Sequence, residues 1–207
     1  MRAHTEKRTV AGPAGSIEVA LDSPDGAARA TAVIAHPHPV YGGTMDNKVV
    51  QTIARAAVAE GLKAVRFNFR GVGASAGEYD EGRGEIDDML AVINACAAEG
   101  PLVLAGFSFG AFVTSHVIER LHTHRAIGQV VLVGPATSRF DVADIPEELH
   151  ERTLIIHGER DDVVELSSTM DWARSQSLPV LVVPDVGHFF HGQLNLLKAV
   201  VARHLRA

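Results

Sequence analysis

Ser108 has the strongest sequence context for chemistry in this chain. It lies in Gly106-Phe107-Ser108-Phe109-Gly110, between a short apolar run and a segment with helical spacing. This pattern predicts a sharp strand–turn–helix that exposes a serine hydroxyl, with glycines where strand and helix approach each other. The backbone N–H groups at the start of the helix can stabilise a developing negative charge. The alternative is a glycine-rich turn whose serine only caps the helix.

Two later loops carry a carboxylate and an imidazole that a serine nucleophile requires. The segment 157–164 holds Asp161 and Asp162, and spacing alone does not separate them. The segment 184–191 holds His188 directly after an apolar run, and His191 three residues later is the weaker candidate. A free serine is a weak nucleophile, which a histidine base oriented by a carboxylate activates. A structural or exposed role for each loop residue is the alternative.

The elements that must position these groups alternate along the chain. Short Val/Ile/Leu runs predict strands, and amphipathic spacing predicts a helix after most of them. The expected strands are 33–35, 64–69, 102–105, 130–133, 154–156 and 180–183; the expected helices are 46–60, 84–98, 109–121, 165–177 and 191–205. Continuous apolar strands are typical of a parallel sheet that is covered on both faces.

The sequence therefore predicts an α/β fold with a doubly wound, mostly parallel sheet of about seven to eight strands and helices on both faces. Residues 1–207 are expected to form one domain, with residues 1–22 as an antiparallel hairpin at the edge of the sheet. In such sheets, reactive groups lie on the loops at the carboxyl ends of the strands. Ser108, the 157–164 loop and His188 all follow strands in this way.

Composition excludes several classes of protein. The 207 residues include 19 Lys and Arg against 25 Asp and Glu, a net charge of −6, and 46% are hydrophobic. These are values of an ordinary globular protein, neither disordered nor basic enough to neutralise nucleic-acid phosphates. No apolar run approaches the roughly 18 residues of a membrane helix, and the polar start is unlike a secretory signal. We expect a cytoplasmic protein without nucleic-acid or membrane partners.

The sequence supports a metal or cofactor site less well than it supports a serine nucleophile. The chain has 11 histidines, but close pairs such as His36 and His38 do not supply the three or four convergent ligands of a zinc site. The glycine-rich segment 71–77 lacks the glycine spacing of a dinucleotide-binding loop. Cys96 lies on an apolar helix face and is expected in the core. No metal or cofactor is predicted.

These motifs resemble the α/β-hydrolase superfamily, in particular its small lid-less bacterial members related to dienelactone hydrolases. The resemblance runs from about residue 31 to residue 205. It rests on the three loops, on His36-Pro37-His38-Pro39 with the segment 42–48, and on the segment 69–75. It implies that Ser108 is the nucleophile, His188 the base and Asp161, rather than Asp162, the acid.

The resemblance also implies an oxyanion hole formed by backbone N–H groups of His38 and Phe109. Pro37 stands where the family commonly has glycine, and proline fixes φ and cannot donate, so the Tyr41 N–H is a reserve donor. The side chains expected near the substrate are those of Tyr41, Phe107 and Phe189, with core packing as the alternative for each.

The expected function is that of a serine hydrolase that cleaves small carboxylic esters through an acyl-enzyme. Residues 134–152, where many relatives insert a lid, are too few for a helical cap, so we expect an open, shallow site and short acyl groups. A thioesterase or peptidase with the same three residues is an alternative within the enzyme class. A catalytically idle binding protein of the same fold is the alternative outside it.

Overall fold

One eight-stranded sheet forms the centre of the molecule, in the order β1-β2-β4-β3-β5-β6-β7-β8. The computed structural model describes residues 4–206, so residues 1–3 of the expected hairpin and residue 207 of the expected domain lie outside the described part. The first two strands form an antiparallel hairpin, and β2 pairs antiparallel with β4, whereas the other neighbouring strands are parallel. The predicted fold class is confirmed.

The strands are short in the parallel part and longer in the edge hairpin. Their bounds are β1 His4–Gly12, β2 Gly15–Ser23, β3 Thr31–Ala35, β4 Lys63–Phe67, β5 Leu102–Phe107, β6 Ile127–Val133, β7 Thr153–Gly158 and β8 Val180–Val183. The carboxyl ends of β3 and β5 to β8 lie along one edge of the sheet, as the pairs Phe107–Val133, Val133–Ile156 and Gly158–Val183 show. This edge receives the loops singled out in the sequence.

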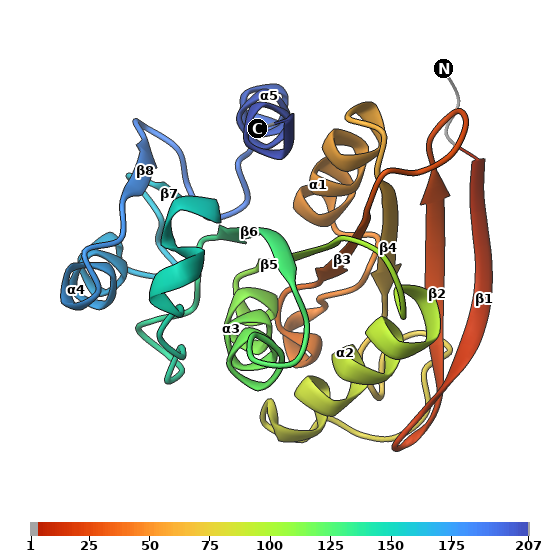
Figure 1. The fold of residues 1–207 in the computed structure, drawn as a ribbon. Helices are drawn as coiled ribbons and strands as arrows, with labels where there is room; N and C mark the ends of the chain where they lie inside the picture. The colour runs from red at the N-terminus through yellow and green to blue at the C-terminus, as the bar shows by residue number, and fades with distance from the viewer. Residues whose placement is uncertain (1–3, 207) are drawn as a thin grey trace.

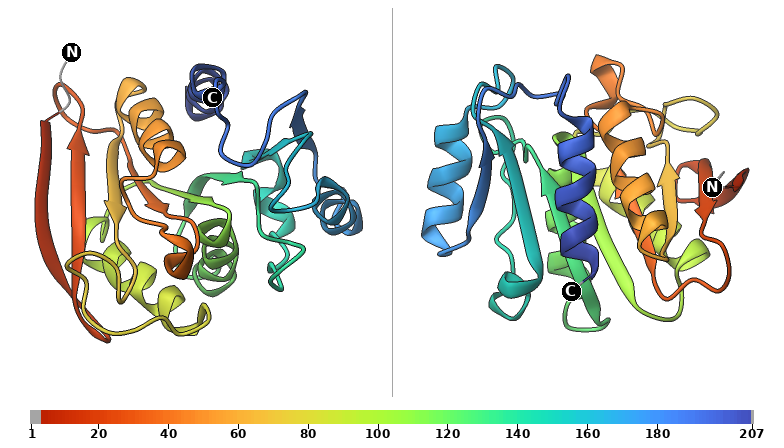
Figure 2. Two further views of the ribbon diagram at one scale, coloured as in Figure 1. Left: turned by 180° about the vertical axis from the view of Figure 1, so that it is seen from behind. Right: turned by 90° about the horizontal axis from the view of Figure 1, so that it is seen from above.

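Helices cover both faces of the sheet (Figure 1). On one face, α1 (Lys48–Ala59) and α5 (Leu194–Arg206) lie side by side, as Figure 2 shows from above. On the other face lie α2 (Arg83–Cys96), α3 (Phe109–Leu121) and α4 (Leu166–Ser175). Every residue of the central strands β3 and β5 is buried, whereas the edge strand β8 has one exposed and two half-buried residues.

The side chains of β3 show how the two layers are built. All five positions of this strand are buried. Val33 and Ala35 belong to the core beneath α2 and α3, whereas Ala32 and Ile34 belong to the core beneath α1 and α5. Because successive side chains point to opposite faces, an apolar residue at every position is what a strand between two helical layers requires.

Two predicted helix starts differ from the structure by two or more residues. The helix expected from residue 46 begins at Lys48, because Asn47 caps it by accepting a hydrogen bond from Val49 N at 2.9 Å. The helix expected from His191 begins at Leu194, and His191 lies in the preceding turn. The turn separates His191 from the periodic apolar positions of α5, which apolar spacing alone did not reveal.

The glycine-rich segment after β4 is a turn held by a buried ion pair. The Arg70 guanidinium donates to both carboxylate oxygens of Asp88 on α2, at 2.9 and 2.8 Å, and Arg70 N donates to the same carboxylate at 3.0 Å. Asp88 is fully buried. Arg70 therefore anchors the turn to α2.

Candidate active site

Ser108 occupies a strained position between β5 and α3. Its φ of 57° and ψ of −117° lie in a region that non-glycine residues seldom adopt. The turn is held by Ser108 N, which donates to Val133 O at 2.9 Å, and by Ala111 N, which donates to Ser108 O at 2.9 Å. Such backbone strain is concentrated at functional sites, where surrounding structure maintains it.

The glycines on either side of Ser108 are required by close backbone contacts. A Cβ on Gly106 would lie 2.2 Å from Gly110 O, and a Cβ on Gly110 would lie 2.3 Å from Ala35 O. These distances are far below normal carbon–oxygen contacts, and the atoms met are backbone atoms that cannot turn away. The two glycines thus let the start of α3 approach β5 and the end of β3.

Asp161 and His188 form a hydrogen-bonded pair at the same edge of the sheet. His188 Nδ1 lies 2.7 Å from Asp161 Oδ2, and both side chains are buried. Asp161 Oδ1 accepts hydrogen bonds from Val163 N at 2.9 Å and Val164 N at 2.8 Å. Asp161 rather than Asp162 therefore contacts the imidazole, and the loop that follows it closes on its carboxylate.

The hydrogen bonds to Asp161 keep its carboxylate ionised. Burial alone raises the pKa of a carboxyl group, but here the hydrogen bond and charge of His188 and the N–H groups of Val164 and Val163 hold the pKa of Asp161 below its usual value. An ionised Asp161 requires a proton on His188 Nδ1, so the neutral imidazole has an unprotonated Nε2. That nitrogen is the one that can accept a proton.

His188 lies beside the turn that contains Ser108. Its ring packs 4.8 Å, centroid to centroid, from that of Phe107, the residue before Ser108. A Cβ built on Gly134 would lie 3.3 Å from His188 Cε1. Gly134 directly follows Val133, which is the strand partner of Phe107. Among the described residues, the Ser108 hydroxyl makes no hydrogen bond to His188. Such contacts are often long before substrate binds.

Two backbone N–H groups near Ser108 have no acceptor within residues 4–206. They belong to His38 and to Phe109, the two expected oxyanion donors. The reserve donor, Tyr41 N, donates instead to His38 O at 3.2 Å within the short helix η1 (Pro39–Tyr41). Unpaired N–H groups at a helix start and in a nearby loop are the kind of donors that bind a developing oxyanion.

His36 supports the loop that carries His38. It is fully buried, accepts a hydrogen bond from Phe69 N on Nε2 at 3.1 Å, and contacts Pro37 O through Nδ1 at 2.6 Å. Because Nε2 accepts, Nδ1 carries the proton and donates to the carbonyl. Burial lowers the pKa of His36 to about 4, so the ring is neutral at pH 7. His36 is a support of this loop rather than part of a metal-binding pair with His38.

Aromatic side chains surround the His38 ring. The rings of Tyr41, Tyr79, Phe109 and Phe140 lie within 4.7 to 5.8 Å of it, centroid to centroid. No sequence motif marks Tyr79 or Phe140, which come from segments distant in the chain.

The three side chains expected near a substrate occupy different environments. Tyr41 is 81% exposed and Phe189 is 42% exposed, on the loops that carry His38 and His188. Phe107 is 0% exposed and packs against His188 from within the core. Tyr41 and Phe189 thus present apolar surface to solvent near Ser108, whereas Phe107 supports the imidazole.

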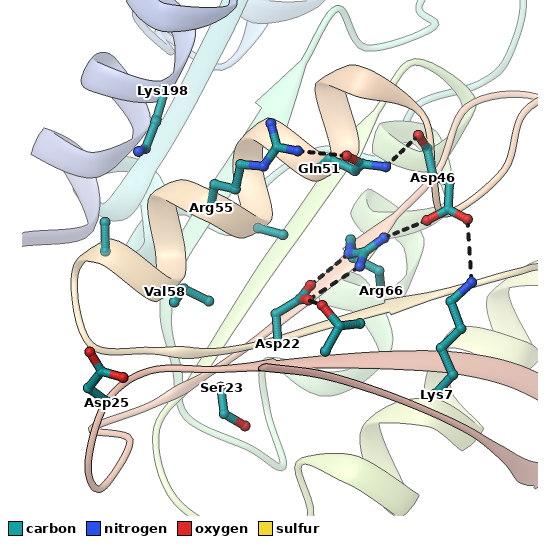
Figure 3. A pocket seen from close by; sticks show the side chains of 13 residues that line it. Lys7, Asp22, Ser23, Asp25, Asp46, Gln51, Arg55, Val58, Arg66 and Lys198 are labelled. Atoms are coloured by element: carbon teal, nitrogen blue, oxygen red, sulfur yellow. Dashed lines mark hydrogen bonds and ion pairs between the residues drawn. The ribbon is translucent and has the colours of Figure 1, made fainter. Parts of the chain in front are cut away.

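Two pockets differ in their relation to this site. A cavity of about 290 Å³ is lined by residues of the 42–49 segment and by Phe189 and His191, next to His188. A larger cavity of about 830 Å³ lies between α1, α5 and the edge hairpin, with Arg66 bonded to Asp22 and Asp46 in its wall (Figure 3). Its lining includes none of Ser108, Asp161 and His188.

Within the described part of the chain, no three His, Cys, Asp or Glu side chains are placed to hold a metal ion together. Cys96 is buried, as the sequence predicts. None of the helices in residues 4–206 has both the length and the apolarity needed to cross a bilayer.

Comparison with known proteins identifies the family. The family model of the alpha/beta hydrolase domain matches residues 28–195. A Xanthomonas campestris protein described as an α/β serine hydrolase without lid is 35% identical over 100% of this chain and 95% of its own, with a TM-score of 0.89. An α/β serine hydrolase homologue from Coxiella burnetii is 37% identical over 99% of this chain and 100% of its own, with a TM-score of 0.85.

An uncharacterised protein of Rickettsia prowazekii is 40% identical over 114 residues, 53% of this chain and 48% of that protein, so the match spans about half of that relative's length. The match to the family model and the two structures extends much further, over the sheet, the helices and the loops of the candidate site. This chain therefore belongs to the α/β hydrolase family, in the form that has no lid.

Proposed function

We propose that this protein is a serine hydrolase that cleaves small carboxylic esters, with Ser108 as nucleophile, His188 as general base and Asp161 as the acid that orients it. The observation that carries the proposal is the 2.7 Å hydrogen bond between His188 Nδ1 and Asp161 Oδ2, at the sheet edge where Ser108 adopts its strained turn. A carboxylate, an imidazole and a serine in this relation are the components of acyl transfer.

The first half of the reaction forms an acyl-enzyme. Ser108 Oγ attacks the ester carbonyl carbon while His188 Nε2 takes the hydroxyl proton, and Asp161 stabilises the resulting imidazolium. The carbonyl oxygen becomes an oxyanion that accepts hydrogen bonds from the N–H groups of His38 and Phe109. His188 then gives its proton to the departing alkoxide, and the alcohol leaves.

The second half releases the acid. Water gives a proton to His188 Nε2 and attacks the acyl carbon, and the same N–H groups of His38 and Phe109 bind the second oxyanion. Collapse of this intermediate breaks the bond to Ser108 Oγ, which recovers its proton from His188. In serine hydrolases, the removal of one oxyanion donor lowers the rate about 100- to 1,000-fold, so a working site needs such donors. The unpaired N–H groups of His38 and Phe109 are available for this role and support the proposal.

Labelling by a fluorophosphonate tests the proposal directly, because this reagent forms a bond with an activated serine. Wild type is expected to be labelled, and Ser108→Ala is expected to lose both the label and the hydrolysis of nitrophenyl acetate. A control, Ser138→Ala, changes an exposed serine and is expected to keep both. Equal labelling of wild type and Ser108→Ala would contradict the assignment.

A substrate screen separates esters from other acyl compounds. The same three residues also suit thioesters and amides, so matched ester, thioester and amide substrates with one acyl group are assayed in parallel. We expect the ester to have the highest kcat/KM, and higher turnover of the thioester or amide would reassign the substrate class. The absence of turnover for all three would favour a binding protein that retains the fold.

A further inference from the structure

His157 contacts Asp161 from inside the core, although the sequence motifs assign it no role. It is the second-last residue of β7 and is fully buried. Its Nε2 lies 3.0 Å from Val164 O and 3.4 Å from Asp161 Oδ2. Within residues 4–206, its Nδ1 is a buried side-chain atom without a hydrogen-bond partner.

These contacts determine which nitrogen of His157 carries the proton. Val164 O and the ionised Asp161 carboxylate are both acceptors, so Nε2 must be the donor. The neutral ring has a single N–H, and Nδ1 is therefore an acceptor without a donor. A buried acceptor left without a partner costs free energy, and such an atom in a folded protein calls for an explanation.

We propose that His157 is a positioning residue for Asp161, which it holds through Nε2–H so that the carboxylate stays directed at His188. This inference rests on the proposed function. The Nε2–H acts at two points: it contacts Oδ2, the oxygen bonded to His188, and it binds the carbonyl of Val164, whose N–H binds Oδ1. Both carboxylate oxygens are thereby restrained by one ring.

The electrostatics of the site agree with a neutral donor. Burial lowers the pKa of His157, and the charge of His188 lowers it further, against the opposing effects of Val164 O and Asp161. A neutral N–H orients the carboxylate without adding a second positive charge beside it. A charged His157 would compete with the His188 imidazolium for Asp161 and weaken the general base.

Substitution at His157 separates positioning from simple packing. His157→Phe keeps a ring but removes the donor, and we expect kcat/KM to fall about tenfold, mostly in kcat, as seen when a partner of a site residue is lost. Asp161 then loses its contact with the Nε2–H group and keeps the hydrogen bond to His188, so the acid limb of the pH profile of kcat/KM is expected to move to higher pH.

Two amide variants act as matched controls. The amide nitrogen of His157→Gln reaches about as far as Nε2, whereas that of His157→Asn reaches only about as far as Nδ1. We expect Gln to restore kcat/KM to within about threefold of wild type and to restore the pH profile, and Asn to restore neither. A folded His157→Phe with the wild-type pH profile and kcat/KM would overturn the proposal.

NMR of wild-type protein with 15N-labelled histidine tests the proposal without any variant or turnover. Because the pKa of His157 is lowered from its ordinary value by burial, we expect a protonated Nε2 and a bare Nδ1 from about pH 7 to about pH 9. A proton on Nδ1, or titration of the ring within this range, contradicts the proposal. Fluorophosphonate labelling of Ser108 is measured on the same sample, so a failure of the proposed function is seen separately.

Discussion

At the scale of single residues, hydrogen bonds orient the Asp161 carboxylate and the His188 ring near Ser108. Asp161 accepts hydrogen bonds on both oxygens, which fixes its rotamer and leaves His188 Nε2 unprotonated in the neutral ring, as the proposed general base requires. The His38 and Phe109 N–H groups have no acceptor in residues 4–206. A site that is aligned before substrate arrives loses less free energy to reorganisation during the reaction.

His36 predicts a loss of stability in acid. Its pKa of about 4 in the folded protein lies below the ordinary value of 6.5, so between these values the unfolded chain binds a proton that the folded chain does not. The stabilisation is therefore complete above about pH 6.5 and is lost as the pH falls toward 4, a change of about 3 kcal/mol.

Urea unfolding at about pH 7 and about pH 4.5 measures this effect. His36→Gln removes the titrating ring. Between about pH 7 and about pH 4.5, we expect the variant to lose about 2 kcal/mol less free energy of unfolding than wild type loses. The control His124→Gln changes an exposed histidine and is expected to behave as wild type. An identical pH dependence for wild type and His36→Gln would rule out this account.

At the scale of secondary-structure elements, β4 holds the loop that leads into α1. Arg66 on β4 donates to Asp22 Oδ2 at 2.8 Å, to Met45 O at 2.9 Å and to Asp46 Oδ1 at 2.9 Å, as Figure 3 shows for the two carboxylates. The loop fixed in this way follows the segment that contains His38. One buried guanidinium thus links the edge hairpin, β4 and the start of α1.

Arg66 and Lys7 make a matched comparison, because both pair with Asp46. Arg66→Met leaves the buried Asp22 carboxylate without its ion pair, and we expect the free energy of unfolding to fall by about 3 kcal/mol. Lys7 contacts Asp46 at 3.7 Å with both side chains about half exposed, so Lys7→Met is expected to cost less than about 1 kcal/mol.

Urea denaturation of the two variants at one pH checks this ranking. Equal losses for Arg66→Met and Lys7→Met would show that burial of the Arg66–Asp22 pair adds no stability beyond that of a surface contact. A loss confined to Arg66→Met supports the view that β4 fixes the loop.

At the scale of the whole molecule, the segment between β6 and β7 lies against the body and forms no lid in the described part of the chain. This segment contains only the short 3₁₀ helix η2 (Glu147–Arg152). Phe140 within it stacks on Phe112 at 4.8 Å and contacts Phe109 at 5.2 Å, centroid to centroid. The segment is packed onto α3, and no lid domain is inserted between β6 and β7 among the residues that the structure describes (Figure 1).

The lack of a lid in residues 4–206 predicts a preference for short acyl groups. Without a lid, a long acyl chain stays partly in water and gains little binding free energy. On a series of nitrophenyl esters, we expect kcat/KM to be highest at about two to six acyl carbons and to fall by at least about tenfold at twelve. Activity that rises up to twelve carbons, or that increases at a lipid surface, would contradict this prediction.

The sequence alone determined the order of elements, the fold class and the position of Ser108 in a strand–turn–helix. These features depend on local properties: apolar periodicity, and glycines that permit one tight turn. The same local reasoning placed the start of α5 at His191 instead of Leu194, because apolar spacing does not locate the turn that precedes a helix. The roles of Ser108, Asp161 and His188 stay predictions until they are tested.

Only the tertiary structure decided which groups meet. The turn after β7 directs Asp161 toward His188 through the N–H groups of Val163 and Val164, and it brings His157 beneath the same carboxylate. In the tertiary structure, the Tyr41 N–H donates a hydrogen bond within η1, whereas the His38 N–H has no acceptor in residues 4–206. These outcomes depend on the register of neighbouring parallel strands and on hydrogen-bond directions between residues far apart in the chain, which local sequence preferences do not specify.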